Sequence, residues 1–247
     1  MRESSLLVGR TLAEVARRIG PGVTTGELDR MAEQFIRDNG ALPGFKGLYD
    51  CPSTLLISVN DEVVHGLPGD RVLRDGDVAS VDCGVLMNGF YGDSAYTFCI
   101  GEVREEVRRL LRVTQECLQL GIAQAVANNR TGDIGHAIQS LAEKEGFSVV
   151  REYCGHGIGK VYHDEPQVLH YGYPGQGMKL KAGMIFTIEP MLNAGKRHVK
   201  TLPDHWTVVT RDGSLSAQWE HMVAVTDNGF EVLSPWPDTM ADYPAIV

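Results

Sequence analysis

Residues 78–98, VASVDCGVLMNGFYGDSAYTF, contain two runs of β-branched and aromatic residues on either side of Asn88-Gly89. Asn-Gly between two such runs is the strongest short signal for a β-hairpin with a two-residue loop. That loop sets the register of the hairpin and places Gly84 opposite Asp93. Because side chains alternate between the two faces of a strand, Asp82 and Asp93 are predicted to be diagonal neighbours on one face.

Diagonal neighbours on paired strands lie about 7–8 Å apart at the backbone, within reach of one shared cation or a close pair of cations. Two carboxylates held together without a cation repel each other, and one of them is expected to bind a proton. The hairpin alone leaves a solvated polar face as the alternative to a metal site.

The composition is that of a globular protein with a full hydrophobic core. The 247 residues are 43% hydrophobic, enough for one large domain or two closely packed halves. A net charge of −9, from 32 acidic and 23 basic residues, argues against a nucleic-acid channel. The chain shows no uncharged apolar segment of signal-peptide or membrane-span length, and its five cysteines include no Cys-x-x-Cys pair. We therefore expect a cytoplasmic protein with buried thiols, no membrane contact and no direct nucleic-acid function.

Periodicity and turn residues outline the remaining elements. A capping box at Thr24 and Glu27 opens one of the predicted helices. The glycine- and proline-rich segment 40–54 is predicted to be a loop that forms part of a pocket wall. The predicted helices span 4–19, 24–39, 103–126 and 131–146, and further strands are predicted over 54–64 and 217–225.

The chain contains an internal repeat. TGEL at 25–28 is echoed by TGDI at 131–134, which is 106 residues later, and each segment opens a helix that ends at a glycine. LRDGDVASVD at 73–82 is echoed by LKAGMIFTIE at 180–189, which is 107 residues later. Two matches at nearly the same offset indicate a duplicated domain.

The duplication makes Asp82 and Glu189 equivalent residues that meet between the halves. Glu220, in the predicted strand 217–225, is then the second-half equivalent of Asp93. Four carboxylates in one partly dry cleft require cations, because an isolated buried carboxylate costs several kcal/mol. Two divalent cations would balance this charge.

Three histidines stand near special backbone positions. His156 is flanked by glycines in CGHGIG, His163 follows in YHDEP, and His65 begins the turn HGLPG. Each is a weak signal by itself, and a capping or surface role is the alternative for His65. One histidine added to four carboxylates makes an oxygen-rich site suited to Mn²⁺, Fe²⁺, Co²⁺ or Zn²⁺ and not a thiolate site.

The segments VVHG, SVDCG, GFYGDSA, CGHGIG, YHDEPQV, FTIEPM and AQWEH together resemble the signature segments of the type I methionine aminopeptidases, in the same order. The resemblance implies an α+β pita-bread fold, in which two pseudo-twofold-related halves surround an antiparallel or mixed sheet with helices on the outer face. It implies one catalytic domain over residues 1–247, with halves of roughly 1–127 and 128–247. It also implies a monomer that removes the initiator methionine before a small second residue, with transient ribosome contact as an open option.

The resemblance also assigns roles to residues. It implies two divalent ions, of Co, Mn, Fe, Ni or Zn, with Asp93 and Glu220 as the bridging ligands. It makes His65, His163 and Glu189 catalytic, with both histidines also touching substrate. The implied metal ligands are Asp82, Asp93, His156, Glu189 and Glu220, and the candidate pocket residues are Phe45, Leu56, Tyr162 and Trp206.

Two features depart from the family pattern. Leu56 stands where many bacterial members have cysteine, and a few extra residues lie around 48–51. Both lie near the expected pocket rim and leave the preference for the second residue open. The alternatives to a methionine-specific enzyme are an X-Pro-directed peptidase of the same fold and a metal-free binding protein that has lost catalysis.

Overall fold

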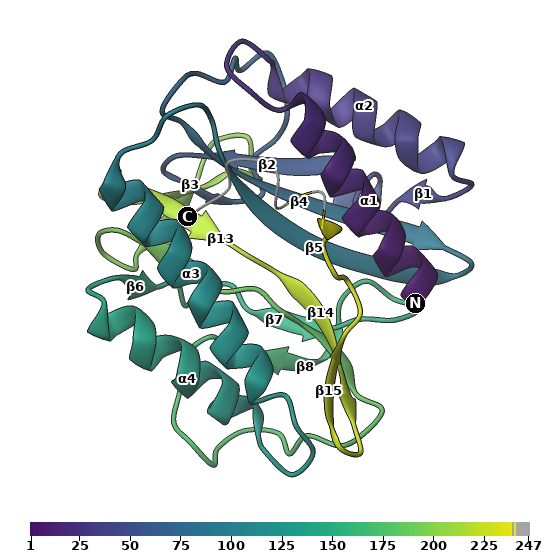
Figure 1. The fold of residues 1–247 in the computed structure, drawn as a ribbon, viewed down its shortest axis with the longest axis vertical. Helices are drawn as coiled ribbons and strands as arrows, with labels where there is room; N and C mark the ends of the chain where they lie inside the picture. The colour runs from purple at the N-terminus through teal and green to yellow at the C-terminus, as the bar shows by residue number, and fades with distance from the viewer. Residues whose placement is uncertain (239, 241–247) are drawn as a thin grey trace.

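The computed structural model describes residues 1–238 and 240, and its helices and strands form separate layers (Figure 1). The helices are α1 (Arg2–Arg18), α2 (Thr25–Asp38), α3 (Glu105–Ala123) and α4 (Thr131–Lys144), with a 3₁₀ turn, η1, at Leu48–Asp50. None of the helices in the described part of the chain combines the length and apolar character that crossing a membrane requires.

The first-half strands are β1 (Leu42–Pro43), β2 (Leu55–Val59), β3 (Glu62–Val64), β4 (Val78–Met87) and β5 (Phe90–Cys99). The second-half strands are β6 (Ser148–Val149), β7 (Gly155–Gly157), β8 (Asp164–Val168), β9 (Ile185–Ile188), β10 (Met191–Asn193), β11 (Val199–Thr201), β12 (Val208–Thr210), β13 (Ser216–Gln218), β14 (His221–Thr226) and β15 (Gly229–Val232). The described strand pairs are antiparallel, as the predicted α+β class allows.

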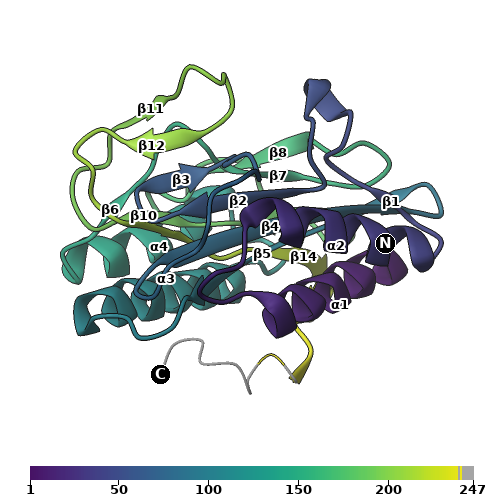
Figure 2. The same ribbon diagram turned by 90° about the horizontal axis from the view of Figure 1, so that it is seen from above.

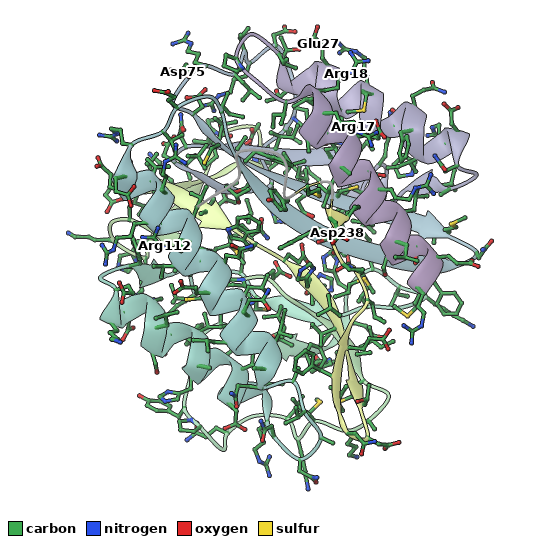
Figure 3. The ribbon with its side chains drawn as sticks, in the orientation of Figure 1. Arg17, Arg18, Glu27, Asp75, Arg112 and Asp238 are labelled. Atoms are coloured by element: carbon green, nitrogen blue, oxygen red, sulfur yellow. The ribbon has the colours of Figure 1, made fainter. Side chains whose placement is uncertain are left out.

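The four helices lie along one face of the strands, and β11 and β12 lie on the opposite side (Figure 2). Apolar side chains of the helices are fully buried against the strands, among them Leu12, Leu28, Leu111 and Ile138. The charged side chains of Arg17, Arg18 and Arg112 lie on these helices away from the strands (Figure 3). Helices α1 and α3 thus each have one apolar and one solvated side, which is the amphipathic pattern from which they were predicted.

The predicted hairpin is confirmed as β4 and β5, with Gly84 opposite Asp93 and Asp82 opposite Ala95. Asn88 and Gly89 have φ values of 52° and 77°, which is the left-handed pair that a type I′ turn requires. Asparagine and glycine adopt this conformation at low cost, so the turn residues fix the register of the whole hairpin.

The repeat is visible in matching hydrogen bonds. Backbone N–H groups of Thr25 and Gly26 donate to the carbonyls of Arg71 and Gly69, and those of Thr131 and Gly132 donate to the carbonyls of Met178 and Gln176. The turns before the equivalent strands β4 and β9 also match, with φ values of 88° at Gly76 and 90° at Gly183. The two halves therefore repeat the same helix entry and the same strand entry.

The halves meet where β5 of the first half lies against the β13–β14 segment of the second. The N–H of Glu220 donates to the carbonyl of Ala95 at 3.0 Å, and Ser94 Oγ donates to the carbonyl of Glu220 at 2.6 Å. Thr97 Oγ1 donates to the carbonyl of Gln218. These bonds hold a carboxylate of the second half directly beside Asp93.

Two predicted strands are each divided in the structure. The predicted strand 54–64 consists of β2 and β3, because Asn60 turns the chain with a φ of 63° and bonds through its side chain to Val78 and Asp77. The predicted strand 217–225 consists of β13 and β14, because the chain changes partner strands at Trp219 and Glu220. In both cases the sequence pattern favours one continuous strand. Hydrogen bonds of a side chain, or between the two halves, interrupt that strand.

Burial of the cysteines follows the prediction except at one position. Cys154 is only partly buried and lines a cavity. The other four cysteines are buried.

Candidate active site

A cavity of about 650 Å³ opens between the two halves. The lining residues come from strands, loops and η1, and none of them belongs to α1–α4. All of the side chains that the sequence singled out as site residues line this one cavity, namely Phe45, Leu56, His65, Asp82, Asp93, His156, Tyr162, His163, Glu189, Trp206 and Glu220. The segment 40–54 supplies part of the wall, as predicted for that loop.

Each carboxylate comes from a different strand or from a segment that follows a strand. Asp82 lies on β4 and Asp93 on β5, while Glu189 directly follows β9. Glu220 lies in the break between β13 and β14, where its backbone is bonded to β5. Asp93 and Glu220 are almost fully buried, with exposed fractions of 2% and 1%.

The carboxylates are strongly perturbed by burial and by one another. Burial raises the pKa of Asp82 to about 7 and the pKa of Glu189 to about 8. Burial, followed by the negative charges of the other carboxylates, raises the pKa of Asp93 and of Glu220 well above their ordinary values. The folded chain by itself therefore disfavours the charged forms of these acids, and a bound positive charge would reverse that preference.

Several buried oxygen atoms in this cluster are left without a protein partner. Asp82 Oδ1, Asp93 Oδ1 and Glu220 Oε1 accept no hydrogen bond within the described part of the chain. Buried polar atoms are almost always paired, so such a group points to a missing ion or ligand. Orphaned carboxylate oxygens are the ligands that a divalent cation would use.

His156 completes a set of converging donor atoms. Asp93, His156 and Glu220 each offer a ligand atom, and the three atoms lie within 4.8 Å of one another. The Nε2 atom of His156 also lies 3.7 Å from Asp93 Oδ2 and 3.7 Å from Glu189 Oε1. One imidazole and several carboxylates fit a divalent metal of the Mn, Fe, Co, Ni or Zn group.

The glycines beside His156 are required by close backbone contacts. A Cβ atom at Gly155 would lie 2.3 Å from the carbonyl oxygen of Thr187, and one at Gly157 would lie 2.1 Å from that of Glu165. The Nδ1 atom of His156 lies 3.0 Å from the carbonyl oxygen of Gly157, so this nitrogen carries the proton. Burial lowers the pKa of His156 to about 4, which leaves Nε2 as a neutral donor atom facing the carboxylates.

Two residues that the sequence did not single out hold this cluster in place. Thr187 accepts a hydrogen bond from the N–H of His156 at 2.9 Å and donates one to Glu189 Oε1 at 2.8 Å. His170 is fully buried, and its Nε2 accepts a hydrogen bond from the N–H of Glu189 at 3.1 Å. Such outer-shell partners orient metal ligands, and no local sequence pattern marks them.

His65 and His163 face the cavity beside the carboxylates. His65 has a left-handed backbone, with a φ of 60°, and its ring meets Tyr153 and Trp206 edge-on at centroid distances of 5.3 and 6.2 Å. Burial, followed by the charge of His163, lowers the pKa of His65 to about 4. A non-glycine residue in this conformation stores strain, which is typical of functional positions.

His163 lies at the mouth of the cavity. Its ring is 4.3 Å from that of His156, and its other side is stacked at 5.7 Å on Tyr49. Tyr49 belongs to the extra residues noted in the sequence and is 68% exposed. The sequence placed these extra residues near the pocket rim, but it did not indicate the contact with His163.

An apolar pocket adjoins the carboxylates. Phe45, Leu56 and Tyr162 are buried in one hydrophobic cluster, and Trp206 packs against that cluster while partly exposed. The rings of Phe45 and Tyr162 lie 5.2 Å apart. A pocket of this kind suits an unbranched apolar or thioether side chain.

The chain is similar in sequence and in structure to known metallopeptidases. The model of metallopeptidase family M24 matches residues 1–227. Methionine aminopeptidase 1 of Bacillus subtilis is 50% identical over 234 residues, covering 95% of this chain and 94% of that protein. The crystal structure of methionine aminopeptidase from Rickettsia prowazekii superposes with a TM-score of 0.94 and 42% identity, covering 95% of each chain.

A more distant structure shares only the fold. The prolidase from Pyrococcus horikoshii superposes with a TM-score of 0.76 and 19% identity, covering 96% of this chain and 61% of that one.

Proposed function

Because the chain belongs to the methionine aminopeptidases of metallopeptidase family M24, we propose that it removes the initiator methionine from peptides and nascent proteins at a site that holds two divalent cations. It is a hydrolase with the pita-bread fold. The observation that carries the proposal for the site is the convergence of Asp93 on β5, His156 on β7 and Glu220 between β13 and β14 onto one point. We propose that Asp82 and Glu189 would supply the remaining ligands to the two cations.

Divalent cations bound there would lower the pKa of coordinated water toward about 7 and so supply a nucleophile at neutral pH. Glu189 would accept a proton from the attacking water and pass it to the leaving amine, a role worth roughly 10²–10⁴-fold in rate. His163, at the cavity mouth, is proposed to donate a hydrogen bond to the developing oxyanion. His65 is proposed to hold the scissile amide or the backbone of the second residue.

The apolar pocket is proposed to hold the methionine side chain. Phe45, Tyr162 and Trp206 present aromatic surface to this space, and aromatic edges interact favourably with a thioether. Leu56 closes part of the same wall. We propose that the substrate carries methionine first and a small residue second.

We propose one catalytic domain over residues 1–247, with halves of roughly 1–127 and 128–247, that acts as a monomer in the cytoplasm. The net charge of −9 argues against direct action on nucleic acid, and a ribosome contact would be transient.

An activity assay on protein stripped of metal tests the proposal. Titration with Mn²⁺, Fe²⁺, Co²⁺, Ni²⁺ and Zn²⁺ should restore release of methionine from Met-Ala-Ser, whereas an X-Pro peptide should be cleaved far more slowly. Activity without any cation would contradict the metal site, and faster cleavage of the X-Pro peptide would contradict the substrate. Protein that binds none of these cations and stays inert would point to the metal-free binding-protein alternative.

A further inference from the structure

The ring of Tyr162 forms part of the apolar wall of the proposed methionine pocket, and its hydroxyl group has no role in that wall. The residue is 3% exposed, and its hydroxyl has no hydrogen-bond partner within the described chain. Its ring is held by other rings, with centroid distances of 5.2 Å to Phe45, 5.0 Å to Tyr91 and 5.0 Å to His163. These contacts fix the direction in which the hydroxyl points.

The hydroxyl lies directly over Gly84 on the β4–β5 hairpin. A Cβ atom at Gly84 would lie 2.3 Å from the Tyr162 oxygen, so only glycine leaves room for it. Gly84 is opposite Asp93 in the register, and it shares a face with Asp82. The hydroxyl therefore lies beside both carboxylates of the hairpin, over the position directly opposite Asp93.

The neighbouring acceptors match this donor. Asp82 Oδ1 and Asp93 Oδ1 are also buried without a hydrogen-bond partner. Burial raises the pKa of the Tyr162 hydroxyl, and among the neighbouring charged groups Asp93 adds most to that increase. A tyrosine hydroxyl is protonated at neutral pH, so it can donate to a carboxylate, and hydrogen bonds to ionised acceptors are the stronger ones.

We propose that the Tyr162 hydroxyl donates a hydrogen bond to Asp93 and thereby orients this carboxylate toward the metal ions. Tyr162 is then a positioning residue for the metal centre as well as a wall of the pocket. The inference rests on the proposed metal site and goes beyond it, because it gives the hydroxyl of a pocket residue the role of holding a metal ligand in position. Hydrogen-bond partners of metal ligands typically contribute 10–100-fold to metal affinity.

Tyr162→Phe tests the proposal, because it removes the hydroxyl and keeps the ring. Calorimetric titration of the metal-free protein with Mn²⁺ should show affinity at least about 10-fold weaker than in the wild type. The visible absorption bands of the Co²⁺-loaded protein should also shift, because they report the geometry of the ligands. Tyr91→Phe is the matched control: it removes a hydroxyl from a ring that packs on Tyr162, and it should behave as the wild type.

A second variant covers the case in which the phenylalanine ring repacks. Gly84→Ala would displace the Tyr162 hydroxyl and should weaken Mn²⁺ binding in the same way, and the two substitutions should not be additive when combined. Unchanged Mn²⁺ affinity and an unchanged Co²⁺ spectrum in Tyr162→Phe would overturn the proposal. Failure of the wild type to bind Mn²⁺ or Co²⁺ would instead refute the metal site itself, and with it this inference.

Discussion

The crowded carboxylates should make the metal-free protein less stable as the pH rises, and Glu189→Gln should relieve this. Burial raises the pKa of Glu189 from 4.5 to about 8, so the folded state binds a proton that the unfolded state has lost between these values. The free energy of unfolding therefore falls as the pH increases through that window. Glutamine keeps the Oε1 acceptor for Thr187 and carries no charge, so the variant lacks this loss.

The magnitude follows from the pKa. One pKa unit corresponds to about 1.4 kcal/mol. The raised pKa of Glu189 therefore lowers the free energy of unfolding of the metal-free protein by up to about 5 kcal/mol at pH 8. Asp82 and Asp93 titrate together with Glu189, so a single substitution should recover part of this, about 2 kcal/mol. In a chain of this size, that gain raises Tm by about 4–8 °C.

Differential scanning calorimetry of chelator-treated protein at pH 5 and pH 8 measures the effect. The variant should melt above the wild type at pH 8 and close to it at pH 5, and saturating Mn²⁺ should remove or reverse the advantage. Glu106→Gln, whose side chain is 67% exposed, is the control and should show no such pH dependence. Equal Tm values at pH 8, or a difference of the same size at both pH values, would refute the reasoning.

Three further substitutions separate the roles of site residues. His163→Ala should leave bound metal intact, as counted by atomic emission, while kcat falls about 10²–10³-fold, and an equal loss of metal would place His163 among the ligands. Asp93→Ala should lose metal and activity together, so full metal content would remove it from the ligand set. Thr187→Val breaks bonds of 2.9 and 2.8 Å and should lower the free energy of unfolding in urea by about 1–3 kcal/mol; an unchanged transition midpoint would contradict that contribution.

Local chemistry in the sequence determined the hairpin, the helix entries and the repeat. Asn88-Gly89 dictates a turn of one type, and that turn alone fixes the opposition of Gly84 and Asp93. The capping box at Thr24 forms as predicted, because its partners are only three residues apart. The repeat extended this local information, since equivalent segments fold alike and bring equivalent acids toward one centre.

The tertiary structure alone decided where the second half departs from simple strands and which atoms meet in the cavity. The break at Glu220 follows from a hydrogen bond to Ala95, a residue far away in the chain. The support that Thr187 gives to His156, and the position of the Tyr162 hydroxyl over Gly84, likewise depend on packing between distant segments. Turn and cap residues act on their sequence neighbours and are visible in the sequence, whereas these contacts exist only after the halves have packed together.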